Sequence, residues 1–132
     1  MTTDSTQETC ILIRPRSPAA ARENVRAVLR QGHPHAADMA VADAVLVTSE
    51  LVTNALRHGG GLRGFHCRVR YDHVEITVED GSDAVPVVRA RTGLLVSGGH
   101  GWPTVCRLAD DVTVTRLPGG GKRIVALVPL TA

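Results

Sequence analysis

A long, mostly apolar segment that stops at three glycines constrains the fold of this chain more than any other feature. Residues 36–58 carry apolar side chains on most sides of a helical repeat, and Gly59-Gly60-Gly61 follows directly. A helix that is apolar on most sides is usually buried on most sides, and glycine commonly ends a helix. We therefore expect one central helix over residues 36–58, packed inside the domain.

Two polar residues interrupt this apolar helix. Glu50 and Asn54 stand four positions apart, so they lie one above the other on the same helical face. A carboxylate and an amide oxygen suit a hard cation such as Mg²⁺, with phosphates and waters as its other ligands. A solvated strip on an amphipathic helix has the same pattern, and the pair taken alone favours that simpler interpretation.

The remaining periodic segments predict helices and strands in a fixed order. Ser17 followed by Pro18 is typical of a helix start, and Gly32 is typical of its end. Segments with a period of two predict strands. The expected strands are residues 10–14, 64–71, 74–80, 112–117 and 124–130, and the expected helices are residues 18–32, 36–58 and 103–109.

Most of these strands follow one another as hairpins, with a turn expected at Asp72-His73 in the first. The fold class is therefore α+β: a two-layer α/β sandwich whose mixed, mostly antiparallel sheet is covered on one face by helices. Residues 81–98 lack a periodic pattern, and such long connections are often functional. The 132 residues fit a disordered N-terminal tail over residues 1–9 and one domain over residues 10–132.

Composition excludes several classes of function. A net charge of +2 is too small to indicate a surface for nucleic acid or membrane. Cys10, Cys67 and Cys106 are odd in number and form no C-x-x-C pair, which favours reduced thiols in a cytoplasm over disulfides or a zinc site. We expect neither a signal peptide nor a stretch long enough to span a bilayer.

Three elements in one order give the sequence its specific signature. They are E-x-x-x-N-A from Glu50 on the long helix, D-G-S from Asp80 after a strand, and G-H-G from Gly99 at a helix start. In this combination the chain resembles the GHKL (Bergerat-fold) ATP-binding domains, over nearly its whole length. The run from Ser49 to Gly59, S-E-L-V-T-N-A-L-R-H-G, is most similar to the small anti-sigma-factor serine/threonine kinases of actinobacteria.

This resemblance implies a role for individual residues. Glu50 would be the general base, Asn54 the magnesium ligand and Asp80 the adenine anchor. Gly99 and Gly101 would belong to a phosphate-facing lid loop, with ATP and Mg²⁺ as cofactors. The implied ATP-binding residues are Asn54, Arg57, His58, Asp80, Ser82, Gly99, His100 and Gly101.

The resemblance also implies a reaction and partners. The γ-phosphate of ATP would pass to a serine or threonine of an anti-anti-sigma (STAS) protein. The same chain would sequester a sigma factor, and so regulate transcription by partner switching; homodimerisation stays open. The alternative is a catalytically weak or inactive ATP-binding module that acts by protein binding alone. Glu50 favours the kinase, because a pure binder needs no base.

Three departures from the family pattern keep that alternative open. The box that begins at Asp80 lacks its second glycine. Trp102-Pro103 follows the lid motif where leucine is usual, and Trp102 either reshapes the lid or, more simply, fills the core. Arg123 stands in the last strand where a threonine often helps to bind adenine through water.

Overall fold

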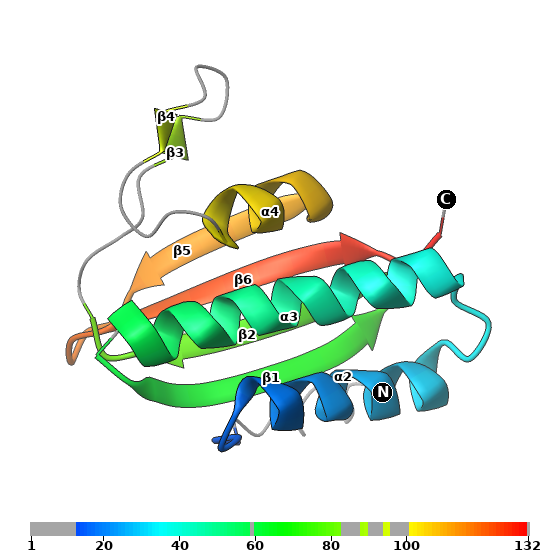
Figure 1. Ribbon diagram of the computed structural model, residues 1–132, viewed down its shortest axis with the longest axis horizontal. Coiled ribbons are helices and arrows are strands. Elements are labelled where there is room, and N and C mark those ends of the chain that lie inside the picture. The colour runs from blue at the N-terminus through cyan, green and yellow to red at the C-terminus, as the bar shows by residue number, and fades with distance from the viewer. Residues whose placement is uncertain (1–12, 59, 83–87, 90–93, 96–100, 132) are drawn as a thin grey trace, which may run out of the picture.

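The protein folds as an antiparallel sheet with helices on one face (Figure 1). The computed structural model describes residues 13–58, 60–82, 88–89, 94–95 and 101–131. The helices are α2 (Pro18–Gly32), α3 (Asp38–His58) and α4 (Gly101–Leu108). The main sheet contains β1 (Leu62–Arg70), β2 (His73–Asp80), β5 (Asp111–Arg116) and β6 (Lys122–Pro129), in the order β1-β2-β6-β5. The predicted α+β sandwich is therefore confirmed.

Helix α2 has the start and the buried face that the sequence predicts. The Ser17 side chain accepts a hydrogen bond from the Ala20 amide at 3.1 Å, and Pro18 occupies the first helical position. Ala21, Val25 and Leu29, spaced by four, are buried. Helix α2 thus packs one apolar stripe against α3 and β1.

Helix α3 crosses the middle of the sheet and builds the centre of the core. It begins at Asp38, two residues later than expected, and ends at His58. By length and composition, residues 38–57 are apolar enough to cross a membrane, which corrects the expectation that no segment is long enough. Packing on the sheet accounts for this composition, because one face of α3 is fully buried: Ala44, Val47, Leu51, Val52 and Ala55.

The core face of the sheet follows from strand register. Residues that are directly opposite each other in β2 and β6 point to the same side, and the pairs Val74↔Val128, Ile76↔Ala126 and Val78↔Ile124 are buried beneath the helices. The opposite face of the sheet carries ion pairs such as Arg68–Glu75 at 2.9 Å. The core face of β2 and β6 is therefore mostly apolar, and charged side chains of β1 and β2 gather on the opposite face.

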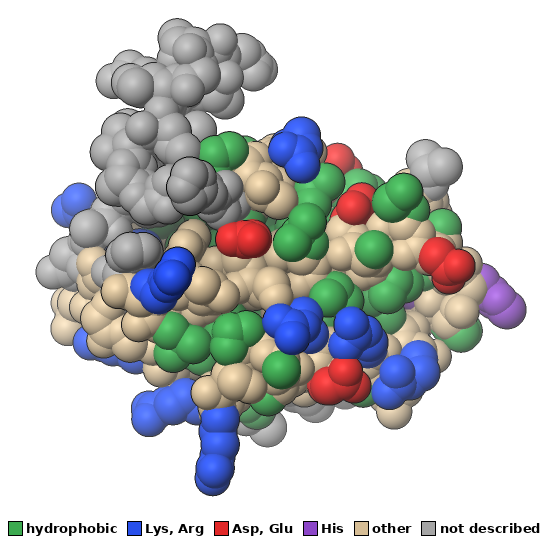
Figure 2. Space-filling model, viewed as in Figure 1, with side chains coloured by type: hydrophobic (Ala, Val, Ile, Leu, Met, Phe, Trp, Pro, Cys, Tyr) green, Lys and Arg blue, Asp and Glu red, His purple; other side chains and the backbone are tan. Residues whose placement is uncertain are grey.

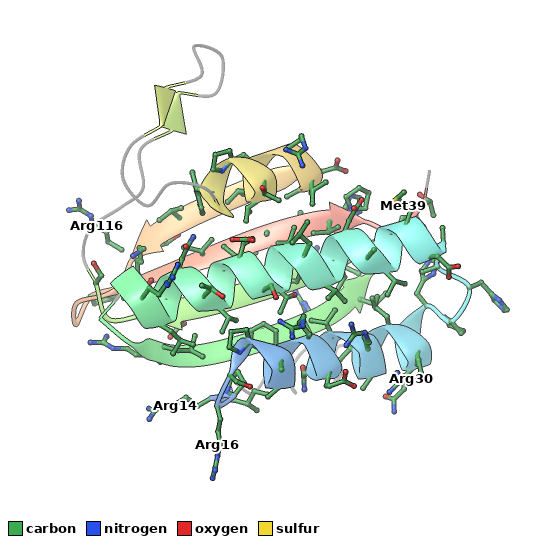
Figure 3. All side chains as sticks on the ribbon, viewed as in Figure 1. Arg14, Arg16, Arg30, Met39 and Arg116 are labelled. Atoms are coloured by element: carbon green, nitrogen blue, oxygen red, sulfur yellow. The ribbon has the colours of Figure 1, made fainter. Side chains whose placement is uncertain are left out.

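The solvent-facing surface of the helices mixes apolar and basic side chains. Figure 2 shows apolar side chains exposed along α3, beside basic side chains over α2. Met39 and Leu46 on α3 are 71% and 41% exposed, and Arg30 projects from the end of α2 (Figure 3).

Several element ends differ from the sequence prediction by one or two residues; β1 and β6, for example, each begin two residues earlier than expected. Three other departures concern a turn and short strands. The turn between β1 and β2 is Tyr71-Asp72, one residue earlier than expected, because Arg70 pairs with His73. Ile13 forms an antiparallel bridge with Phe65, whereas the rest of the expected strand up to residue 12 lies outside the described residues. Two strands of two residues each, β3 (Val88–Arg89) and β4 (Leu94–Leu95), are too short to leave a periodic pattern.

Candidate functional site

The end of α3, the end of β2 and the start of β6 meet at one end of the sandwich (Figure 1). The Gly61 amide donates to the Ala55 carbonyl at 3.2 Å, and the Gly81 amide donates to the Gly61 carbonyl at 3.2 Å. Positive φ angles of 72° and 104° at Gly60 and Gly61 let the chain turn there. These contacts tie the last turns of α3 to the residue that follows Asp80. Two of the three motifs found in the sequence are thereby brought together.

Glu50 and Asn54 are both half-buried on α3. Within the part of the chain that the structure describes, neither side chain has a hydrogen bond or an ion pair. Both side chains remain partly open to solvent, so they need no hydrogen-bond partners inside the protein. A carboxylate and a carboxamide without such partners remain available to a ligand.

Asp80 is not a lone carboxylate. Its side chain is 4% exposed, and the Lys122 Nζ lies 3.0 Å from both Oδ1 and Oδ2. The Ser82 amide also donates to Oδ1, at 2.9 Å. The predicted adenine anchor therefore carries a buried ammonium partner that sequence reasoning did not identify.

Lys122 and Arg123 are neighbours on β6 and lie on opposite faces of the sheet. Arg123 points to the open face of the sheet, where its Nε lies 2.7 Å from Glu79 Oε2. Lys122 is the residue on the core side, in register with Asp80. Alternation along β6 could have revealed this, because Ile124, Ala126 and Val128 share the face of Lys122.

The other predicted site residues have less defined positions. Arg57 is exposed near the end of α3, and Gly101 begins α4. Gly99 and His100, and the side chain of His58, lie outside the described residues. The predicted lid loop is therefore not described by the structure.

Trp102 belongs to the core. It is 6% exposed and packs in the main apolar cluster, which agrees with the simpler of its two interpretations. Among the described residues its indole Nε1 is the one buried side-chain nitrogen or oxygen without a hydrogen-bond partner.

The residues at this end of the sandwich fit a Mg²⁺-nucleotide at its phosphate end. Asn54 and Glu50 offer oxygen ligands or acceptors, and Mg²⁺ is commonly held by few protein groups plus phosphates and waters. No cluster of three or more His, Cys, Asp or Glu occurs within the described residues, which is compatible with such a sparse site. The part of the site that would hold the adenine base fits less simply, because the Asp80 carboxylate already has an ion-pair partner in Lys122.

A helix-covered antiparallel sheet, with its polar residues gathered where α3 and β2 end, has the architecture of GHKL-type ATP-binding domains. A family model described as the histidine kinase-like ATPase domain matches residues 12–128. This match covers most of the 132 residues, and the chain belongs to that family. A comparison with curated proteins gave no match.

Proposed function

We propose that the protein is an ATP-dependent protein serine/threonine kinase that uses Mg²⁺. The observation that carries the proposal is Glu50, a half-buried carboxylate one helical turn before Asn54 and without a protein partner among the described residues. A carboxylate so placed can accept the proton of an attacking hydroxyl. A pure nucleotide binder has no use for this group.

Each polar residue has a distinct task in this mechanism. The Asn54 carboxamide oxygen would hold Mg²⁺, and Glu50 would take the proton from the serine or threonine that is phosphorylated. Bound Mg-ATP supplies the phosphoryl group. The core packing of α3, on which Leu51 and Ala55 are 1% exposed, fixes the spacing of the two side chains.

The proposed partners follow from the run between Ser49 and Gly59, which resembles anti-sigma-factor kinases. The substrate would be a STAS-type anti-anti-sigma protein. In the absence of that protein the chain would bind a sigma factor, and partner switching would regulate transcription in the cytoplasm.

The second candidate is a regulatory module that binds ATP weakly or transfers no phosphate. The Asp80–Lys122 pair favours it, because the ammonium takes up part of the hydrogen-bonding capacity of the carboxylate that would anchor adenine.

Phosphotransfer separates the two functions. The purified protein is incubated with radiolabelled ATP, Mg²⁺ and STAS proteins from the same genome. The kinase predicts label on a serine or threonine of one of them, and loss of label with Glu50→Gln. Binding of a STAS protein without label on any of them would favour the module.

A further inference from the structure

Asp80 and Lys122 place opposite charges in the core layer of the sheet. They are directly opposite in the β2–β6 register and extend the row that contains Val78 and Ile124. Their side chains are 4% and 6% exposed. A row of apolar pairs thus ends in a buried ion pair, at the end of the sheet where the α3 motif also lies.

Stability alone gives no reason for this pair. Removing two charges from water is costly, and replacing a buried ion pair by apolar residues of similar size is often neutral or stabilising. Lys122 is also the single lysine among 15 basic residues, in a chain that otherwise uses arginine. Lysine presents a compact ammonium with three donors, whereas arginine presents a broad planar fork. A compact donor at this position points to recognition of a small group.

A count of hydrogen bonds shows what the pair can still offer. A carboxylate has about four acceptor sites. The Asp80 Oδ1 accepts hydrogen bonds from the Ser82 amide and from Lys122, and Oδ2 lies 3.0 Å from the same Lys122 Nζ as its ion-pair partner. Within the part of the chain that the structure describes, at least one acceptor site therefore remains on Oδ2. The ammonium of Lys122 has three donors, and at most two of them face the two Asp80 oxygens, so at least one N–H remains beside that acceptor among the described residues.

We infer that Asp80 and Lys122 read the base of the nucleotide together. The Oδ2 of Asp80 accepts from the exocyclic amine of adenine, and the Nζ of Lys122 donates to the neighbouring ring nitrogen, N1. Adenine presents this donor and acceptor side by side on its Watson–Crick edge, and pockets that hold an unpaired base read it by that edge. Lys122 is then a specificity-determining residue for the nucleotide. This inference rests on the proposed function and deepens it.

Base analogues test the contact with N1 in the wild-type protein. Calorimetry compares Mg-ADP with 1-deaza-ADP, in which a C–H group replaces N1, and with 7-deaza-ADP. Hydrogen bonds to charged groups contribute about 1.5–3 kcal/mol, so we expect 1-deaza-ADP to bind roughly 10- to 150-fold more weakly than ADP. The 7-deaza analogue should bind as ADP does. Equal affinity for ADP and 1-deaza-ADP would overturn the inference.

Two neighbouring variants test the assignment to Lys122. Lys122→Met removes the donor, and we expect it to bind ADP and 1-deaza-ADP within about twofold of each other. Both affinities should match the weak affinity of the wild type for 1-deaza-ADP. Arg123→Met is the matched control: it removes one positive charge from the next position of β6, on the opposite face of the sheet. Arg123→Met should keep the wild-type ratio between the affinities for ADP and 1-deaza-ADP. Tighter binding of ADP by Lys122→Met would show that the ammonium competes with the base, and would overturn the inference.

The outcomes separate this inference from the proposed kinase. Discrimination against 1-deaza-ADP without phosphotransfer would leave the inference standing and remove the kinase. Phosphotransfer without discrimination between ADP and 1-deaza-ADP would support the kinase and overturn the inference about Lys122. Absence of any adenine-nucleotide binding would overturn both. The wild-type measurement needs no variant, so a Lys122→Met protein that fails to fold does not block the test.

Discussion

Asp80 and Lys122 lie opposite each other at the ends of β2 and β6, with the Lys122 Nζ 3.0 Å from both carboxylate oxygens. Because both side chains are almost completely buried, removal of either partner leaves an uncompensated charge. We expect Lys122→Met to lower the free energy of unfolding by about 3–5 kcal/mol. Urea denaturation of the protein without nucleotide measures this change.

The double variant Asp80→Asn/Lys122→Met provides the control. It removes both charges and keeps an amide at position 80 that can still accept from Ser82, so most of the stability should return. The two single variants, Lys122→Met and Asp80→Asn, are measured alongside. If the double variant lost as much stability as these two lose together, the two side chains would not be coupled, contrary to the ion pair in the structure.

Gly121 allows β6 to begin next to Asp80. Its φ angle is +88°, a region that L side chains rarely adopt, and an added Cβ would collide with the Asp80 carbonyl oxygen and the Arg63 side chain. We therefore expect Gly121→Ala to destabilise the protein by roughly 2 kcal/mol or more, from backbone strain and overpacking. Thermal unfolding monitored by circular dichroism measures the loss.

Gly119→Ala is the matched control in the same turn. A Cβ at Gly119 meets nothing within 4 Å. Its melting temperature should stay close to that of the wild type. Equal losses for the two alanine variants would contradict the steric explanation.

The fold was largely predictable because its elements are locally encoded. Ser17 and Pro18 start α2, and the alternation from Val74 to Asp80 describes β2 with a boundary error of one residue. Strands β3 and β4 were missed because two residues cannot express a period. The turn at Tyr71 was misplaced by one residue, because a non-glycine residue with a φ of 54° gives no sequence signal.

The site was predictable only in part. Glu50 and Asn54 could be assigned to one face because helical spacing fixes it. The Asp80–Lys122 contact joins residues 42 positions apart, and it depends on the register between β2 and β6. A slip of one residue would have placed Arg123 opposite Asp80 instead. Side-chain alternation in β6 predicts that Lys122 faces inward, but pairing it with Asp80 requires the sheet.

Asn54 carries the prediction of metal-dependent nucleotide binding. Asn54→Ala removes the proposed magnesium ligand, and we expect no Mg²⁺-dependent ATP signal by calorimetry. Leu56→Ala is the control, because this residue of the same helix is 45% exposed and has no role in the proposed site. Wild-type-like ATP binding by Asn54→Ala would exclude Asn54 as the metal ligand.

Glu50 carries the prediction of phosphotransfer. Glu50→Gln preserves the size of the side chain and removes its ability to take a proton. General-base groups contribute about 10²- to 10⁴-fold to rates, so kcat should fall by that range. The Kd for Mg-ATP should change little. A variant with normal kcat would show that Glu50 is not the base.

Because the Cys67 thiol is buried, we expect the free energy of unfolding to fall at alkaline pH. Burial raises the pKa of its thiol from 9.0 to about 12, and the Sγ–H donates to Asn24 Oδ1 at 3.2 Å. Above pH 9 the unfolded chain loses the thiol proton while the folded chain keeps it. The Cys67 contribution is therefore intact below pH 9 and decreases by about 1.4 kcal/mol per pH unit between pH 9 and 12.

Cys67→Val isolates this contribution from other groups that titrate in the same range. Valine is apolar and similar in size, so it keeps the packing of β1 beneath α2 and has no proton to lose. From pH 9 to pH 10.5, the wild type should lose about 2 kcal/mol of unfolding free energy relative to the variant. Urea unfolding at each pH measures the difference. Parallel stability curves for the two proteins would show that the Cys67 thiol is not protected by burial.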